Sequence, residues 1–196
     1  MSSDTIFLIV AVVLIIAVLV AGAILYHQQQ TQRRRLLRER FGPEYDRLVA
    51  TTGSSRAAER ELDARTQRAA AFHIRSLSAE ERAGFTSRWQ QVQAEFVDNP
   101  KVSLAHADDL LGEVMSSRGY PVQDFEQRAA DLSVDHPVVV QHYHAAHGIA
   151  LRHKKDQATT EDLRRAMIHY RTLFQELVSD REPAIPLHTI VSHAAE

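Results

Sequence analysis

The sequence predicts an all-α protein in which an N-terminal transmembrane helix is followed by a soluble antiparallel helical bundle of four to five helices. One observation is a long uncharged apolar segment at residues 6–26. A second is that apolar residues recur at helical spacing, with cap residues at the ends of these stretches. The third is that no segment between residues 27 and 180 keeps the apolar–polar alternation of a half-buried strand.

The first element expected is the membrane helix. Residues 6–26 are 21 consecutive residues without a charge. At about 1.5 Å per residue they span roughly 31 Å, close to the ~30 Å hydrocarbon core of a bilayer. A cleaved signal peptide is the alternative, because residues 21–23 read Ala-Gly-Ala. However, the apolar run is long and residues 1–5 contain no Lys or Arg, so we expect a retained anchor over residues 1–27.

Five arginines follow the anchor and predict its orientation. They are Arg33, Arg34, Arg35, Arg38 and Arg40, whereas the N-terminal side carries only Asp4. Because basic residues stay cytoplasmic, we expect the N-terminus outside and the C-terminal domain in the cytoplasm of a bacterial inner membrane. The arginines act either as a topology signal alone or also as a membrane-surface site for anionic lipid headgroups.

Composition bounds the remaining possibilities. The chain has 196 residues, 44% of them hydrophobic, which is enough for one core. The absence of cysteine excludes disulfides, thiolate zinc sites and cysteine nucleophiles. Residues 1–40 carry a net charge of +3 and residues 41–196 a net charge of −5, so we expect no nucleic-acid partner.

Breaks in the helical pattern divide the soluble part. A basic juxtamembrane helix and linker are expected over residues 28–55, with a helix break at Gly42-Pro43, a short helix over 43–50 and a joint over 51–55. An Ala-rich connector helix is expected over residues 56–77, either weakly packed or half of a helix pair. We expect the helical bundle domain over 78–180 and a mobile tail over 181–196.

Caps and apolar faces predict the helices of this bundle. Ser78 and Glu81 form a capping box before a helix whose face includes Trp89, the only tryptophan. Further helices are expected from Asn99-Pro100 to about residue 118, over 123–132, from Asp135-His136-Pro137 to about 152, and from a Thr160 cap onward. The expected core positions are Phe85, Trp89, Val92, Phe96, Leu104, Ala107, Leu111, Val114, Leu163, Met167, Tyr170, Phe174 and Leu177. A hydrophobic groove left between these helices would be a site for a ligand or a partner helix.

Histidines at residues 142–147 are the strongest candidate for chemistry. His144 and His147 are one helical turn apart and share a face, which suits a metal ion. His142 points elsewhere, and Asp135, His136 or His169 could supply a further ligand. The alternatives are a solvated or interface histidine face, or a pH-sensitive contact.

Other groups of residues indicate a catalytic or binding site less specifically. Ser103, His106 and Asp109 could be drawn as a catalytic triad, but they lie within two helical turns and no oxyanion hole accompanies them. The sequence has no Gly-rich phosphate loop and no HExxH motif. We therefore expect no enzymatic activity and no cofactor.

Four strings lie within residues 41–178, namely FGPEYDR, SLSAEERAGFTSRWQQVQAEFVDNP, RGYPVQDFEQRAADLSVDHP and TTEDLRRAMIHYRTLFQEL. They resemble their counterparts in a family of uncharacterised bacterial single-pass membrane proteins with a C-terminal helical domain. The resemblance implies the same order of anchor, basic stretch and helical domain, and it assigns no role to any residue.

The sequence thus favours a membrane-anchored cytoplasmic helical domain that acts in protein interaction or as a scaffold. Its expected partners are the lipid bilayer, anionic headgroups, and a protein partner or a second copy. The turn-rich segment 118–137 is the surface expected to carry recognition. The alternative is a metal-binding or small-ligand-binding protein, or an enzyme, that uses residues 142–147.

Overall fold

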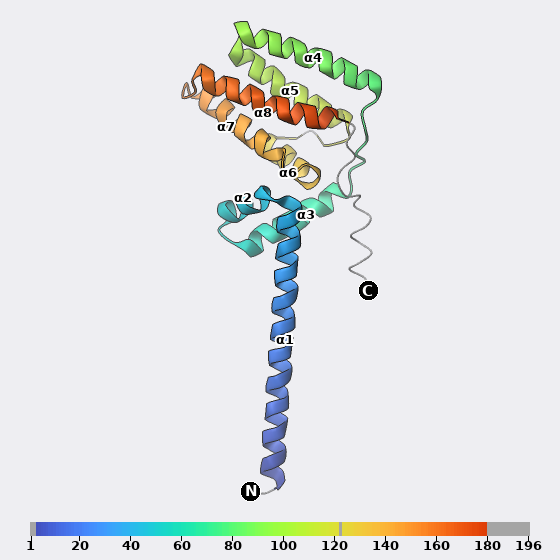
Figure 1. The fold of residues 1–196 in the computed structure, drawn as a ribbon, viewed down its shortest axis with the longest axis vertical. Coiled ribbons are helices and arrows are strands. Elements are labelled where there is room, and N and C mark those ends of the chain that lie inside the picture. Colours follow the sequence, from blue (N-terminus) through green and yellow to red (C-terminus); the bar gives the residue numbers. More distant parts are fainter. Residues whose placement is uncertain (1–2, 122, 180–196) are drawn as a thin grey trace. The chain divides into compact units, whose positions relative to one another are not determined.

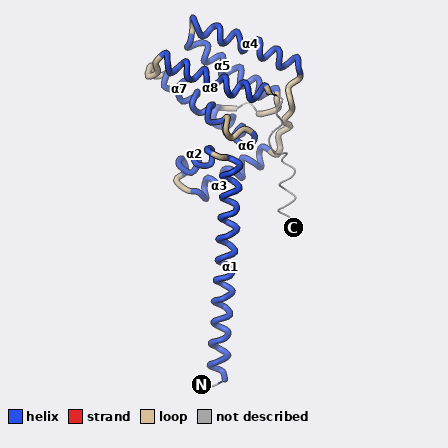
Figure 2. The backbone as a smooth tube through the Cα atoms, viewed as in Figure 1, coloured by secondary structure: helices blue, strands red, loops and turns tan. Residues whose placement is uncertain are grey.

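The computed structural model describes residues 3–121 and 123–179, with side chains from Leu14 onward. Every regular element in this part of the chain is a helix, which confirms the all-α prediction (Figures 1 and 2). The helices are α1 (Ser3–Phe41), α2 (Pro43–Thr52), α3 (Ser55–Ala69), α4 (Ala79–Asp98), α5 (Pro100–Ser117), α6 (Phe125–Asp135), α7 (Val140–Lys154) and α8 (Thr160–Val178). The tail predicted over residues 181–196 lies outside the described residues.

The chain divides into two compact units, Met1–Arg40 and Phe41–Glu196. Helix α1 makes up most of the first unit. Among the described residues, it is the one helix that is long and apolar enough to cross a membrane. The helix break expected at Gly42-Pro43 is confirmed, because Gly42 has a φ of 49° and Pro43 is the first residue of α2. A positive φ favours glycine, and proline at the first position of a helix loses no backbone hydrogen bond.

The connector helix is shorter than its sequence predicts. Ser54 caps α3, whose last residue is Ala69, whereas the expected helix continued to residue 77. The chain then runs past Arg118, whose carbonyl accepts a hydrogen bond from the backbone N–H of Arg75 at 2.9 Å. Phe72 and Ile74 pack against the main core. These tertiary contacts end a helix that local propensity alone would continue.

Helices α4 and α5 form as predicted. Ser78 and Glu81 make the capping box at the start of α4, and Pro100 is the first residue of α5. Trp89 is buried, and its ring stacks on Phe174 with centroids 4.7 Å apart. The other predicted core positions are buried as well, except Phe96, which is half-buried.

The start of α7 differs from the prediction. Asp135 is the last residue of α6, and α7 begins at Val140 without a side-chain cap. The Asp135 carboxylate accepts a hydrogen bond from the Tyr120 hydroxyl at 2.9 Å, and Val139 occupies the cap position of α7. At α8 the cap is Thr159 rather than Thr160, because only Thr159 has a carboxylate three residues ahead to complete a capping box.

The main core is built from α4 to α8. Helix α5 packs against α4 and α8, and α7 packs against α8, as Figure 1 shows. Helix α6 contacts α7 and α3, while α2 contacts α3 and α7. The buried apolar residues of α2 and α3 lie outside the main core cluster. Contacts outside the main core cluster therefore attach α2 and α3 to α6 and α7.

Candidate functional site

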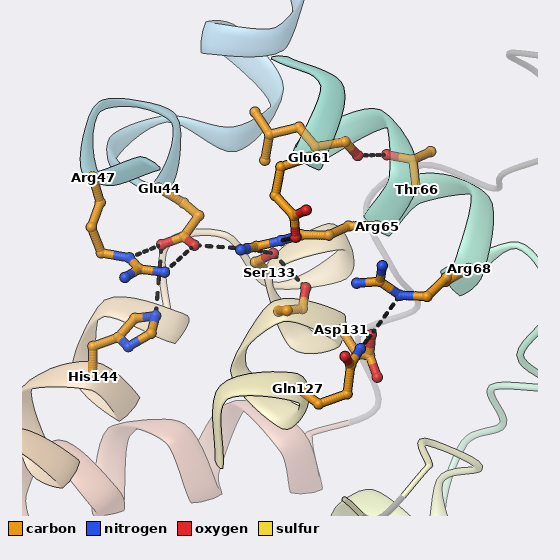
Figure 3. Close-up of polar contacts among 12 residues, drawn as sticks. Glu44, Arg47, Glu61, Arg65, Thr66, Arg68, Gln127, Asp131, Ser133 and His144 are labelled. Atoms are coloured by element: carbon orange, nitrogen blue, oxygen red, sulfur yellow. Dashed lines mark hydrogen bonds and ion pairs between the residues drawn. The ribbon is translucent and has the colours of Figure 1, made fainter. Parts of the chain in front are cut away.

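A group of charged and polar side chains with a buried centre lies where α2 and α3 meet α6 and α7 (Figure 3). We call it the ionic cluster; its members are Glu44, Arg47, Glu61, Arg65, Ser133 and His144. Its centre is the carboxylate of Glu44, which has no exposed surface. Glu44 lies in the first turn of α2, where a negative charge also offsets the helix dipole.

Both oxygens of the Glu44 carboxylate are occupied. Arg47 donates from Nε to Oε2 and from Nη2 to Oε1, each at 2.8 Å. Arg65 of α3 donates from Nη1 to Oε1 at 2.9 Å. Burial alone would raise the pKa of Glu44, but the hydrogen bond and charge of Arg47 and the hydrogen bond of Arg65 outweigh it and hold that pKa below its usual value. Because both of its oxygens accept hydrogen bonds from arginines, this carboxylate links α2 to α3. For the same reason it is a poor general base.

Arg65 extends the ionic cluster to α6. Its Nη1 also donates to the Ser133 hydroxyl at 3.2 Å, and its Nε donates to Glu61 at 2.9 Å. The Ser133 hydroxyl in turn donates to the carbonyl of Ala130 at 2.6 Å. Close by, burial raises the pKa of Asp131, which accepts a hydrogen bond from Gln127 at 2.7 Å. The ionic cluster therefore joins three helices through one buried guanidinium.

His144 and His147 of α7 both contact the ring of Phe125, and the His144 ring lies edge-on to it with centroids 5.5 Å apart. His144 Nε2 lies 3.8 Å from Glu44 Oε2, while the ring of His147 stacks on Phe125 with centroids 3.5 Å apart. His142 instead meets His169 of α8, with 2.9 Å between the two Nδ1 atoms. Within residues 14–121 and 123–179, no three His, Cys, Asp or Glu side chains group as metal ligands. His144 and His147 therefore have no third ligand of these types within the described residues, and their pairing at a metal stays a prediction.

The triad drawn from α5 does not assemble. The Ser103 hydroxyl is buried and donates to the carbonyl of Val92 at 2.6 Å. His106 Nδ1 lies 2.7 Å from a carboxylate oxygen of Glu95 on α4. Asp109 lines a groove of about 460 Å³ between α4 and α5, with the ion pair of Arg88 and Glu113. Ser103 is thus a helix-packing residue, held away from His106.

A second buried polar group lies near the end of α8. Arg118 Nη1 donates to the carbonyl of Leu177 at 2.9 Å, and His136 Nδ1 lies 3.4 Å from a carboxylate oxygen of Glu176. Burial, and then the charge of Arg118, lower the pKa of His136. Arg118 and His136 are both buried, as are Asp131 and Ser133. The segment 118–137 thus has a buried part, which includes residues 129–134, and an exposed part, which includes Gly119, Gln123, Asp124 and Glu126. Its expected role as a recognition surface stays a prediction.

The five predicted membrane-surface arginines lie on the last turns of α1. Arg33, Arg34, Arg35 and Arg38 are exposed, and Arg40 is half-exposed. Arg35 pairs with Glu39 one turn later, at 2.8 Å. Such a pair between exposed side chains is worth little in stability.

A groove of about 600 Å³ runs between α4 and α8. We call it the α4–α8 groove; its lining residues are Thr86, Trp89, Gln90, Gln93, Arg171, Phe174, Gln175, Val178 and Ser179. Trp89 and Phe174 are nearly buried and form its floor, and Arg171 is the only charged residue in the lining. The apolar spacing of α4 and α8 indicated these two aromatic faces, but only the packing of the helices shows that a groove remains between them.

Comparison with known proteins gives no relative: no family model matches the chain, and no curated protein and no solved structure matches it. The described residues define an all-helical protein with one candidate membrane-spanning helix.

Proposed function

We propose that this protein is a single-pass inner-membrane protein whose C-terminal antiparallel helical bundle lies in the cytoplasm and binds a partner protein. The observation that carries the binding role is the α4–α8 groove, which combines an aromatic floor with polar walls. The other strongly polar groups, such as the ionic cluster, are engaged within the fold and hold helices together.

The membrane location is supported by α1 and by the charges that follow its apolar part. The apolar run is long enough to span a bilayer, and the five arginines from Arg33 to Arg40 lie at its C-terminal side. The positive-inside rule then orients the C-terminal unit toward the cytoplasm. The same arginines can contact anionic headgroups, each worth on the order of 1 kcal/mol near the surface.

The lining of the α4–α8 groove indicates the chemistry of its occupant. Grooves between helices commonly accept an amphipathic helix, which buries apolar side chains spaced one turn apart. Trp89, Phe174 and Val178 offer an apolar strip, and Arg171 offers a single positive charge at its side. The expected partner segment is an amphipathic helix with an acidic residue opposite Arg171.

Site-specific photo-crosslinking in living cells tests this proposal. A crosslinking amino acid replaces Gln93, which lines the α4–α8 groove, or Ala94, the next residue, which does not. We expect one crosslinked protein from position 93 only, and we expect Arg171→Glu to abolish it. Equal products from both positions, or none from position 93, would contradict the binding role. A product that consists of two copies of this chain would assign the groove to self-association.

The orientation has its own test. A reporter enzyme active only outside the cytoplasm, fused after Glu196, should be inactive, whereas a cytoplasmic reporter at the same place should be active. The opposite pattern would contradict the topology and leave the groove experiment unaffected.

A further inference from the structure

The ionic cluster contains one histidine, His144, in the second turn of α7 (Figure 3). Its side chain is only 17% exposed, and its Nε2 lies 3.8 Å from Glu44 Oε2. That distance is too long for a hydrogen bond, and Nε2 has no other hydrogen-bond partner among the described residues. We propose that protonation of His144 releases α2 and α3 from α6 and α7, so that this contact is a pH-sensitive latch.

The charges of the ionic cluster balance only while His144 is neutral. Glu44 and Glu61 supply two negative charges, and Arg47 and Arg65 supply two positive charges that are hydrogen-bonded to them. Both oxygens of Glu44 already accept from these arginines. An imidazolium would therefore add a further, unbalanced charge to a buried site, which is costly.

Charged groups from three neighbouring helices act on the His144 imidazole. Burial and then the charge of Arg47 on α2 lower its pKa, and Arg65 on α3 acts in the same direction. Glu44 on α2 and the exposed Glu126 on α6 act against this lowering but do not offset it. The released form, in which His144 meets water, therefore binds the proton more tightly than the docked form.

Acidification thus opens the latch. Docking has its full strength above the ordinary histidine pKa of about 6.5 and weakens as the pH falls below it, until the lowered pKa of the docked form is reached. One proton changes the equilibrium by at most about tenfold per pH unit. The buried carboxyl of Asp131 acts in the opposite direction, because its pKa is raised and its protonation removes a buried charge.

Helices α2 and α3 can separate from α6 and α7 without unfolding the main core. Their buried apolar residues lie outside the main core cluster, which is formed by the later part of the chain. Residues 43–69 also lie between α1 and the main core in the sequence. The latch therefore decides whether the main core is held to the segment that follows the candidate membrane helix. None of its residues lines the α4–α8 groove, so the two proposals are independent.

Hydrogen exchange of the full chain in detergent micelles, followed by mass spectrometry, tests the latch. After correction for the pH dependence of intrinsic exchange, the protection of amides in α2 and α3 should fall roughly 3- to 10-fold between pH 7.5 and pH 5.5. His144→Gln, which stays neutral, should keep the protection of the unmodified chain at pH 7.5 and remove this fall.

The matched control is His136→Gln. His136 is also buried and its pKa is also lowered, but it lies between Arg118 and Glu176, away from the ionic cluster. This variant should leave the fall in α2 and α3 unchanged, and circular dichroism at pH 7.5 verifies that both variants fold. Protection of α2 and α3 that stays constant with pH in the unmodified chain, or that falls equally in His144→Gln, would overturn the proposal.

Discussion

Replacing Glu44 by glutamine should release α2 and α3 from the rest of the C-terminal unit. The substitution keeps the size of the side chain but removes a charge that has no exposed surface and accepts from two arginines. Arg65, whose side chain is only 7% exposed, then loses its buried partner. Removing one partner of a buried pair typically costs about 3–5 kcal/mol, because the other charge stays buried.

The contacts that remain place the cost at the lower end of this range. Arg47 is 36% exposed and can regain water, and Arg65 keeps its bonds to Glu61 and Ser133. We therefore expect a loss of about 3 kcal/mol in the free energy of unfolding. For a unit of this size that corresponds to a fall in Tm of roughly 6–12 °C.

Urea unfolding followed by fluorescence measures this loss, because Trp89 is the only tryptophan and reports on the C-terminal unit. The matched control is Glu61→Gln. Glu61 also accepts from Arg65 at 2.9 Å, but its side chain is 41% exposed, so the control should cost less than about 1 kcal/mol. Hydrogen exchange should show the opening in α2 and α3 first.

A double variant separates the loss of the pair from the burial of an unpaired charge. Glu44→Leu combined with Arg65→Met removes both charges, and apolar replacement of a buried pair is often neutral or stabilising. The double variant should therefore be more stable than Glu44→Gln alone. If Glu44→Gln lowered the free energy of unfolding by no more than Glu61→Gln does, the ionic cluster would not be what holds α2 and α3 to the rest of the unit.

Two further predictions concern strain and pH. A side chain at Gly119 would lie 2.3 Å from a backbone carbonyl and at a φ of 95°, so Gly119→Ala should cost more than about 2 kcal/mol. Gly84→Ala, in an open helical position, should raise the free energy of unfolding by about 0.5–1 kcal/mol in the same urea assay. If the two substitutions changed the free energy of unfolding equally, the backbone at Gly119 would not be strained by a side chain. The lowered pKa of His136, between Arg118 and Glu176, means that the unfolded chain binds the proton more tightly. Stability should therefore fall as the pH drops through about 6.5, and His136→Gln should flatten this slope in unfolding curves between pH 5 and 7.

The local elements of this protein could be predicted from sequence because their signals act over a few residues. The apolar run in α1, the break at Gly42-Pro43 and the capping box at Ser78 depend only on near neighbours along the chain. The spacing of Trp89 and Phe174 marked the faces that become buried. Each of these signals is contained in one continuous stretch of chain, so the sequence alone shows it.

Contacts between distant residues decided the rest. Helix α3 ends early because the following segment packs beside Arg118. Asp135 ends α6 and accepts a hydrogen bond from Tyr120, and α7 begins only at Val140. Glu44 reads as an ordinary acidic residue in a first helical turn until α3 brings Arg65 to it. Pairing of charges and imidazoles depends on which helix faces lie together, and that follows from packing of the whole core. The sequence therefore determined the helices of this protein and their apolar faces, whereas only the tertiary structure decided which of their polar residues meet.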